Sequence, residues 1–302
     1  MLASTTVQPP ISLNPAHSLL ARLAASAADP APRPRLLALL AHPDDEVLAV
    51  GARLEHLRDS RFLVTTDGAP EDGIDARDHG FPSLAVYRAA RQQELHAALA
   101  GLPATLSHPL LLDPANSTSQ IPDKQAMHHL TALTRAFLVE LRAFRPEAIL
   151  THPFEGGHPD HDSCSFAAHA AAALLGPAAP PILEATSYHA GPDGSIRTNA
   201  FLPGNSAAPA VCHLTPEEQA AKRARLACFS SQQETLAQFS LETEQFRLAP
   251  AYDFTLPPHP GPVFYESFGW GLTAADFSRY AQAALVELGL REPGHFGEGK
   301  RP

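Results

Sequence analysis

The chain alternates between short apolar runs and longer stretches in which apolar residues recur at helical spacing. The first apolar run, residues 36–40, stops abruptly at a polar segment that extends from His42 to Glu46. A short uninterrupted apolar run is typical of a strand that is buried on both faces. Because open α/β sheets place their ligand sites at the carboxyl ends of such strands, this polar segment is expected at a functional edge.

Strand-like and helix-like segments continue to alternate over the first part of the chain. Further strands are expected at residues 61–66, 106–112 and 146–151. Helices are expected at residues 46–57, 85–102, 124–144 and 163–175. Between them, residues 67–82 are expected as a loop long enough to form a lid or rim. This order of elements predicts a mostly parallel sheet with helices on both faces.

The last third of the chain is richer in turns. Strands are expected at residues 182–189, 210–214 and 263–268, and helices at residues 215–229 and 273–288. The second of these helices has an amphipathic pattern, and the first starts with a capping sequence at Thr215. The proline-rich residues 1–34 are expected to be an extension that carries one short helix at residues 17–28.

Composition narrows the classes of partner. The 302 residues carry a formal net charge of −10, which argues against binding to nucleic acid or to an anionic membrane surface. Cys164, Cys212 and Cys228 form neither a disulfide framework nor a metal knuckle, which favours a reducing compartment. The sequence shows neither a signal-peptide pattern nor 18 consecutive apolar residues, so a cytoplasmic protein without a membrane span is expected.

A second polar burst follows the strand expected at residues 146–151 and ends in the sequence His158-Pro159-Asp160-His161. A histidine, a carboxylate three residues later and a distant histidine supply three metal ligands and leave a fourth position open, as in catalytic zinc sites. Either burst alone also fits a helix start with acidic residues at its positive end. The presence of both, each directly after an expected strand, favours a metal site.

With these two bursts, AHPDDE and HPDH, the chain resembles the PIG-L/LmbE family of zinc-dependent de-N-acetylases. The similarity extends to Arg91-Gln92-Gln93-Glu94, to residues 222–232, and to Glu266-Ser267-Phe268 in a carboxyl-terminal strand. The resemblance implies a Rossmann-like α/β fold with a smaller β-containing C-terminal part. It also implies one domain at residues 35–290, with a core at 35–180, a part at 181–290 that completes the substrate cleft, and a tail at 291–302.

The resemblance implies that His42, Asp45 and His161 bind zinc and that Asp44 is the general base. Fe(II) can occupy the same set of ligands. Zinc lowers the pKa of its bound water to about 7, and a neighbouring carboxylate that does not bind the metal can take the remaining proton. Asp44 is the carboxylate that remains for this role.

Three further residues receive roles in the same way. His158, as an imidazolium, is expected to stabilise the oxyanion and to protonate the leaving amine, and Asp160 is expected to orient a histidine. Arg91 is expected to contact substrate hydroxyls or a phosphate, although an ordinary helix ion pair with Glu94 explains the same spacing. Some relatives have a tyrosine two residues before the HPDH histidine, whereas this chain has Gly156.

The expected activity is removal of an N-acetyl group from an N-acetylglucosamine-type sugar or glycoconjugate by zinc-activated water. An amidase that acts on a larger acyl group or a thiol conjugate is the alternative within the hydrolases. A metal-bearing sugar-binding protein without turnover is the alternative in another class, and an intact Asp44 argues against it. The expected partner is a small molecule, and the sequence does not determine the oligomeric state.

Overall fold

The structure is a computed structural model, and it describes residues 15–26, 29, 31–103, 106–112, 120–204 and 208–291. The expected tail, apart from residue 291, and the first 14 residues of the expected extension lie outside this part of the chain. No helix within the described ranges is long and apolar enough to span a membrane.

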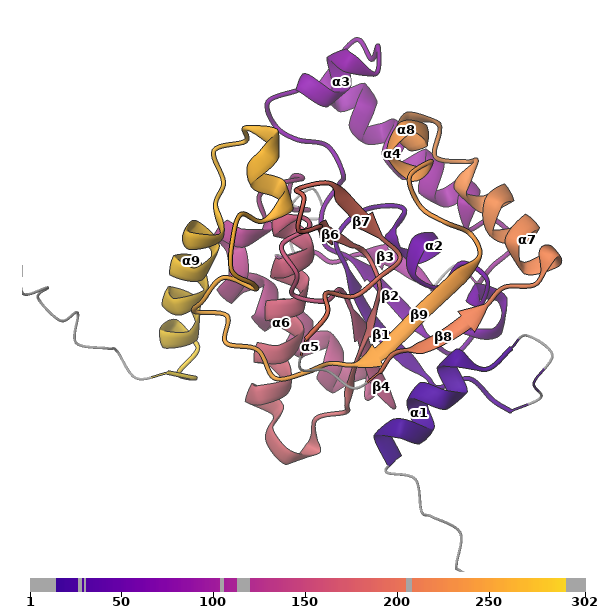
Figure 1. Ribbon diagram of the computed structural model, residues 1–302, viewed down its shortest axis with the longest axis horizontal. Helices are drawn as coiled ribbons and strands as arrows, with labels where there is room; N and C mark the ends of the chain where they lie inside the picture. The colour runs from indigo at the N-terminus through magenta and orange to yellow at the C-terminus, as the bar shows by residue number, and fades with distance from the viewer. Residues whose placement is uncertain are drawn as a thin grey trace, which may run out of the picture.

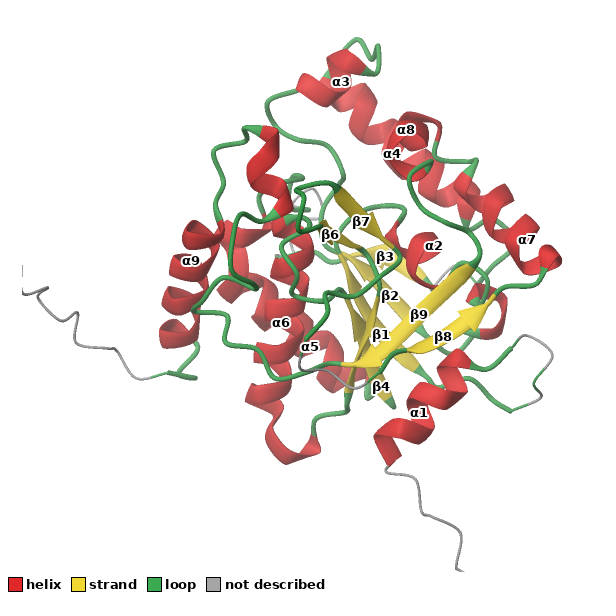
Figure 2. Cartoon of the chain, in the orientation of Figure 1, coloured by secondary structure: helices red, strands yellow, loops and turns green. Residues whose placement is uncertain are grey.

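Seven strands form the central sheet, in the order β3-β2-β1-β4-β5-β9-β8 (Figures 1 and 2). Neighbours from β3 to β5 pair in parallel, whereas β9 pairs antiparallel with both β5 and β8. The strands are β1 (Leu36–Leu40), β2 (Arg61–Val64), β3 (Ser107–Pro109), β4 (Ala148–Thr151), β5 (Ile182–Ala185), β8 (Ala210–His213) and β9 (Thr243–Leu248). A separate hairpin consists of β6 (Tyr188–Ala190) and β7 (Ile196–Thr198). The predicted mostly parallel sheet is confirmed, and its C-terminal strands extend one edge.

Helices cover both faces of the sheet, as the sequence predicts (Figure 2). The α-helices are α1 (Pro15–Ala24), α2 (Asp45–Val50), α3 (Ile74–Asp78), α4 (Leu84–Ala98), α5 (Leu130–Phe144), α6 (Pro159–Leu175), α7 (Pro216–Leu226), α8 (Gln233–Leu236) and α9 (Ala274–Glu287). Short 3₁₀ turns are η1 (Leu54–His56), η2 (Ala126–His129), η3 (Gly176–Ala178), η4 (Ser230–Gln232) and η5 (Phe264–Phe268). The capping box predicted at Thr215 is present at the start of α7.

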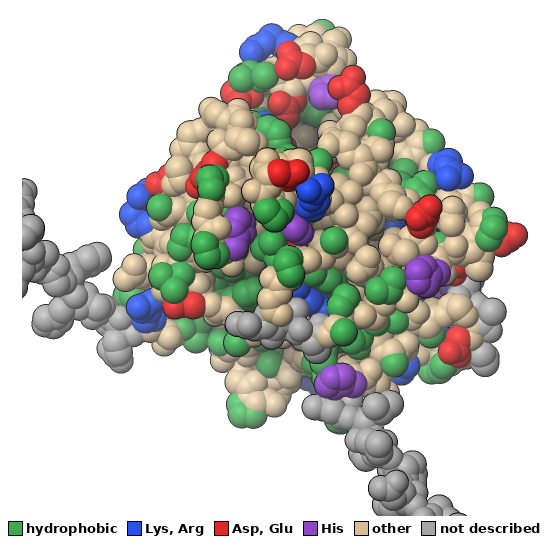
Figure 3. Space-filling view, in the orientation of Figure 1, with side chains coloured by type: hydrophobic (Ala, Val, Ile, Leu, Met, Phe, Trp, Pro, Cys, Tyr) green, Lys and Arg blue, Asp and Glu red, His purple; other side chains and the backbone are tan. Residues whose placement is uncertain are grey.

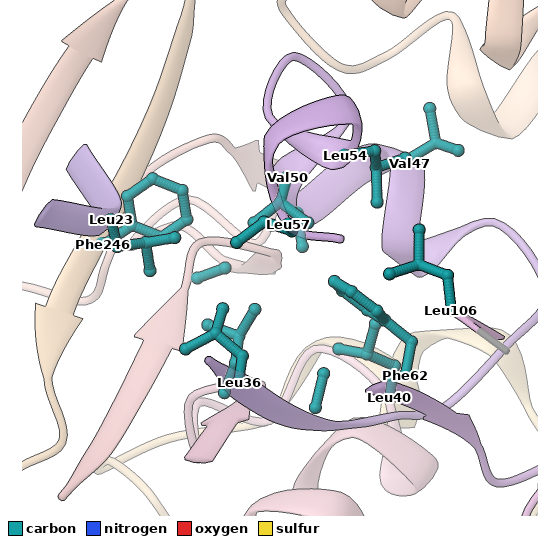
Figure 4. Packing of buried hydrophobic residues seen from close by; sticks show 14 of the residues in the cluster. Leu23, Leu36, Leu40, Val47, Val50, Leu54, Leu57, Phe62, Leu106 and Phe246 are labelled. Carbon is teal, nitrogen blue, oxygen red and sulfur yellow. The ribbon is translucent and has the colours of Figure 1, made fainter. Parts of the chain in front are cut away.

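Strand β1 shows why the core has two layers. Its alternate residues Leu36, Ala38 and Leu40 pack with α1, α2, α4 and α7, whereas Leu37 and Leu39 pack with α5 and α6. Figure 4 shows the first of these layers, in which β1 meets α2 and the strand neighbours of β1. All five residues of β1 are buried, which explains its continuous apolar sequence.

Helix α1 lies within the expected N-terminal extension, yet it packs against β8 and β9. Its Leu23 is fully buried and belongs to the same core layer as Phe246 of β9 (Figure 4). The described part of the extension is therefore built into the fold. Whether residues 35–290 form the complete domain stays a prediction.

The strand expected at residues 263–268 is wrong, because this segment forms the 3₁₀ turn η5. Its backbone bonds to a loop, with Phe264 N donating to Gly156 O at 2.8 Å, and Gly269 ends the turn in a left-handed conformation with φ 68°. Glu266 accepts a hydrogen bond from Ala274 N at the start of α9. The glutamate that resembles a family strand position therefore caps a helix.

Other expected elements also have different bounds, among them the helix expected at residues 46–57, which consists of α2 followed by η1. The strand expected at residues 182–189 divides into β5 and β6, which belong to different sheets. The helix expected at residues 124–144 consists of η2 followed by α5. The loop at residues 67–82 contains the short helix α3.

Candidate active site

The two polar bursts meet at one edge of the sheet. Strands β1 and β4 are parallel neighbours, with Leu39 opposite Thr151, so the segments after their carboxyl ends lie side by side. A cavity of about 220 Å³ opens there, and His42, Asp44 and His158 line it. This is the place at which open α/β sheets bind ligands.

Three side chains converge closely enough to hold a metal ion. Nε2 of His161 lies 3.2 Å from Nδ1 of His42, and the Asp45 carboxylate oxygens lie 3.5 and 3.6 Å from these two nitrogens. Two imidazoles and one carboxylate are the ligand types that zinc prefers in catalytic sites. The structure thus brings together the three residues expected to bind zinc.

The outer nitrogens of these histidines have their own partners. Nε2 of His42 lies 3.1 Å from Oδ1 of Asp123, and Nδ1 of His161 lies 3.0 Å from Oγ of Ser187. In the tautomers that these contacts favour, both outer nitrogens carry the proton and donate it, which leaves the inner lone pairs toward a shared centre. Such outer hydrogen bonds orient metal-binding histidines in many proteins. Asp123 and Ser187 are residues that the sequence analysis missed.

A second set of ligand-type atoms comes from His42, Asp123, His158 and Asp160, which also lie within 4.8 Å of one another. Here the acceptors already have donors. Nδ1 of His158 accepts a hydrogen bond from Asp160 N at 3.2 Å, which assigns the proton of the neutral ring to Nε2. Both Asp160 oxygens accept backbone N–H groups, from Lys124 and Ala126. The hydrogen bonds therefore favour the first set as the metal group.

Asp44 lies beside the metal group and faces Arg91. Arg91 Nη2 donates to Asp44 Oδ2 at 3.0 Å, and both side chains are buried. Burial raises the pKa of Asp44 to about 6, although the Arg91 charge opposes that rise. A carboxyl group that titrates near neutral pH is suited to accept a proton during a reaction.

Arg91 also lies 3.7 Å from Glu94 on the same helix, so the ion pair expected as the alternative exists. Glu94 is itself held by the backbone N and the hydroxyl of Ser231, in the predicted 222–232 segment. Arg91 both lines the cavity and forms an ion pair with Asp44. Its contact with a substrate stays a prediction.

Asp45 owes its charge to the surrounding imidazoles. Burial alone would raise its pKa, but His152 and His161 outweigh burial and hold the pKa of Asp45 well below its ordinary value. His152 stacks on His161 with ring centroids 4.0 Å apart and accepts a hydrogen bond from Ala41 N. His152 therefore packs against one of the proposed metal ligands.

His158 differs from expectation in its charge. Burial, together with the nearby His42, lowers the pKa of His158 to about 3, so this environment favours a neutral ring over the expected imidazolium. The neutral ring still presents an Nε2–H donor to the cavity wall, because Nδ1 is the acceptor for Asp160 N. Asp160 contacts both His158 and His42: its backbone N donates to His158, and its Oδ2 lies 3.4 Å from His42 Nε2.

The structure explains why position 156 holds glycine in this chain. Its φ is 70°, and a Cβ there would lie only 2.4 Å from Cγ1 of Val263 in the segment that leads into η5. A larger residue therefore requires the buried Val263 to shift, and it is also strained at this positive φ. Tyr188 of β6 lines the cavity from another direction.

Surface charge on the visible face is mixed. In Figure 3 acidic, basic and histidine side chains are interspersed, and no extended basic patch covers that face.

The fold and the site define the class: this is an open-sheet α/β protein with a group of two histidines and one aspartate that could hold a metal ion, next to a buried carboxylate. Residues 37–172 match the family described as PIG-L, GlcNAc-PI de-N-acetylase. The match covers residues 37–172, and over these residues it confirms the resemblance stated for the sequence.

Two named relatives match part of the chain. The chain is 30% identical over 141 residues to 1D-myo-inositol 2-acetamido-2-deoxy-alpha-D-glucopyranoside deacetylase 1 of Frankia alni. This match covers 40% of this chain and 48% of that relative. It is 34% identical over 148 residues to the corresponding deacetylase of Mycobacterium sp. strain KMS, with 42% and 46% covered. The chain thus spans about half the length of the curated relatives it matches.

Solved structures support the fold. An A40926 pseudoaglycone deacetylase has a TM-score of 0.54 at 20% identity and covers 73% of this chain and 99% of its own. A zinc-inhibited teicoplanin deacetylase has a TM-score of 0.51 at 18% identity, with 70% and 97% covered. At these identities the similarity concerns the Rossmann-like fold alone.

Proposed function

We propose that this protein is a metal-dependent hydrolase that removes the N-acetyl group from an N-acetylglucosamine-type sugar or glycoconjugate. The observation that carries the proposal is the position of Asp44 and His158 in one cavity with His42, Asp45 and His161. The named relatives and the family description, which concern deacetylation of acetamido sugars, support the same reaction.

We propose zinc as the metal, held by His42 Nδ1, Asp45 and His161 Nε2, with Fe(II) as the other ion that suits these ligands. The fit rests on the outer hydrogen bonds to Asp123 and Ser187, which leave the inner lone pairs available. When bound, zinc would supply Lewis-acid polarisation of the amide carbonyl and a bound water with a pKa of about 7.

Asp44 is the proposed general base. Its carboxylate accepts the proton of the attacking water and can deliver it toward the leaving nitrogen. Arg91 holds one carboxylate oxygen at 3.0 Å, which fixes the orientation of the group. The same guanidinium lines the cavity, where we propose that it contacts substrate hydroxyls.

His158 is the proposed donor to the developing oxyanion. Nδ1 of the neutral ring accepts a hydrogen bond from Asp160 N, so Nε2 carries the proton and can donate it to an oxyanion. A preorganised donor of this kind typically contributes about 3 to 4 kcal/mol to lowering the barrier. Asp160 is a positioning residue that keeps the histidine pair in place.

We propose that residues 35–290 act as one unit in this reaction. The cavity wall supports this, since Gln232, Phe239 and Trp270 of the C-terminal part line the same cavity as His42.

The test is acetate release from a panel of N-acetylated sugars by zinc-loaded protein, with the same protein treated with a chelator as control. We expect release that disappears with the chelator and returns with zinc. Release of longer acyl groups in preference to acetate would point to the amidase alternative. Absence of any release by zinc-loaded protein that still binds the sugars would point to the binding protein without turnover.

A further inference from the structure

Two stacked aromatic rings stand at the rim of the cavity. Phe268, at the end of η5, and Trp270 have ring centroids 4.6 Å apart at an interplanar angle of 19°. Phe268 is 47% exposed, which makes it one of the exposed large apolar side chains in the described part of the chain. An exposed aromatic ring stacked on a second ring at a cavity mouth is typical of a surface that a ligand covers.

The pair is connected to the centre of the site through Trp270. The indole packs edge-on against His158, with centroids 5.3 Å apart, and Lys124 Nζ lies 4.4 Å from its centroid. The cation and Phe268 both lie against the indole, and Trp270 is partly buried whereas Phe268 is exposed. A group that contacts Phe268 therefore lies one ring away from the residue that contacts His158.

Cavity size indicates which part of a ligand reaches this pair. The cavity measures about 220 Å³, below the range of about 300–1,000 Å³ that encloses most of a drug-sized ligand. It suits a single sugar ring beside the metal group. A substituent on that sugar then extends over the rim, where Phe268 is exposed.

The charges of the lining select against an anionic substituent. Four aspartates line the cavity: Asp44, Asp45, Asp75 and Asp123. The two cations of the described lining already face carboxylates, Arg91 at Asp44 and Lys124 at Asp75. A phosphate at the rim would therefore have to compete with Asp75 for Lys124 and with Asp44 for Arg91, which weakens its binding.

We propose that Phe268 and Trp270 form a subsite for a planar, apolar or aromatic aglycone attached to the acetamido sugar, and that phosphate-bearing glycosides are poor ligands. The inference rests on the proposed function for the position of the sugar. It goes further because it names the kind of aglycone and the residues that select it.

The chain offers a built-in reporter, because Trp270 is its single tryptophan. The experiment titrates zinc-loaded Asp44→Asn protein, which keeps substrate intact, with phenyl and methyl β-glycosides of N-acetylglucosamine. Binding is followed by tryptophan emission and, independently, by calorimetry. We expect the phenyl glycoside to bind about three- to tenfold more tightly, the range for one aromatic pair contact.

Variants assign that preference to the rim. In the Asp44→Asn background, Phe268→Ala should remove the advantage of the phenyl glycoside and leave the affinity for the methyl glycoside unchanged, whereas Phe268→Tyr should keep it. The matched control is Val139→Ala on α5, which truncates another exposed apolar side chain, 64% exposed, away from the cavity. N-acetylglucosamine 1-phosphate should bind more weakly than the methyl glycoside.

Equal affinities for the two glycosides, a phenyl preference that survives Phe268→Ala, or tighter binding of the phosphate would each overturn the proposal. Failure of the proposed function has a different signature. In that case wild-type protein releases no acetate from either glycoside, whatever the binding measurements show.

Discussion

At the scale of single residues, the site depends on partners that lie far apart in sequence. The motif residues His42 and His161 could be predicted because each directly follows a strand or opens a helix in a recognisable local pattern. Asp123 could not, because it is a lone aspartate in a polar stretch whose contact with His42 arises only from tertiary folding. Ser187 could not be predicted for the same reason.

Asp123→Ala should weaken metal binding about 10- to 100-fold, the usual effect of removing an outer hydrogen-bond partner of a metal-binding histidine. The physical cause is loss of the contact that holds His42 Nε2–H, which frees the ring to turn. Competition with a chromogenic chelator measures the affinity. Asp75→Ala is the matched control, since Asp75 lines the cavity but faces Lys124. Equal affinities of the two variants would contradict this role for Asp123.

Asp44→Asn should lower acetate release about 10²- to 10⁴-fold, the usual contribution of a general base, and leave the metal content unchanged. The amide keeps the shape of the side chain and an acceptor for Arg91, but it cannot take a proton. Activity and metal analysis on the same preparation test this. Loss of the metal together with activity would show instead that Asp44 is a ligand.

At the scale of elements, the strands that the sequence predicted well are those with continuous apolar runs, such as β1 and β4. Strand β9 received no prediction because its buried positions include Glu244 and Arg247, which disrupt an apolar alternation. These charges are paired, Glu244 with Arg53 and Lys222, and Arg247 with Glu184 on the neighbouring strand. A strand whose buried positions carry paired charges lacks the apolar pattern that predicts a strand.

The ion pairs of β9 also carry an imbalance. Arg247 faces two buried carboxylates, Glu155 at 2.9 Å and Glu184 at 2.7 Å. Burial raises the pKa of each glutamate to about 7, although the Arg247 charge opposes the rise. The folded protein therefore binds more protons here than the unfolded chain between the ordinary glutamate pKa and about 7.

This imbalance predicts that the free energy of unfolding falls as the pH rises from about 4.5 to about 7, by on the order of 1 kcal/mol per pH unit for each glutamate. The stabilisation is complete below the unfolded pKa and is lost as the pH passes the folded value. Glu155→Gln should flatten this slope. Urea unfolding at several pH values measures it, and an unchanged slope in the variant would contradict the assignment.

At the scale of the whole molecule, the proposed metal connects segments that follow β1 and β4. Because the ligand group exists only in the folded chain, a metal that binds there stabilises the fold by mass action. At a free zinc concentration about 100-fold above Kd, the gain is about 2.7 kcal/mol. Thermal unfolding with zinc and with chelator should therefore differ by several degrees.

His161→Ala provides the control for this effect, since it removes one proposed ligand. Its midpoint should no longer respond to zinc. A response that persists in this variant would place the stabilising ion elsewhere on the protein.

The order of residues along the chain separates two properties of the site. The proposed metal and proton-transfer residues all precede residue 172, where the family match ends, whereas the stacked rim pair follows residue 260. Substitution of the exposed Phe268 can therefore change which molecules bind without altering the proposed metal and proton-transfer residues. Grafting the end of η5 from one homologue to another should thus transfer ligand preference while turnover persists, as long as Trp270 against His158 and Ser187 against His161 are kept.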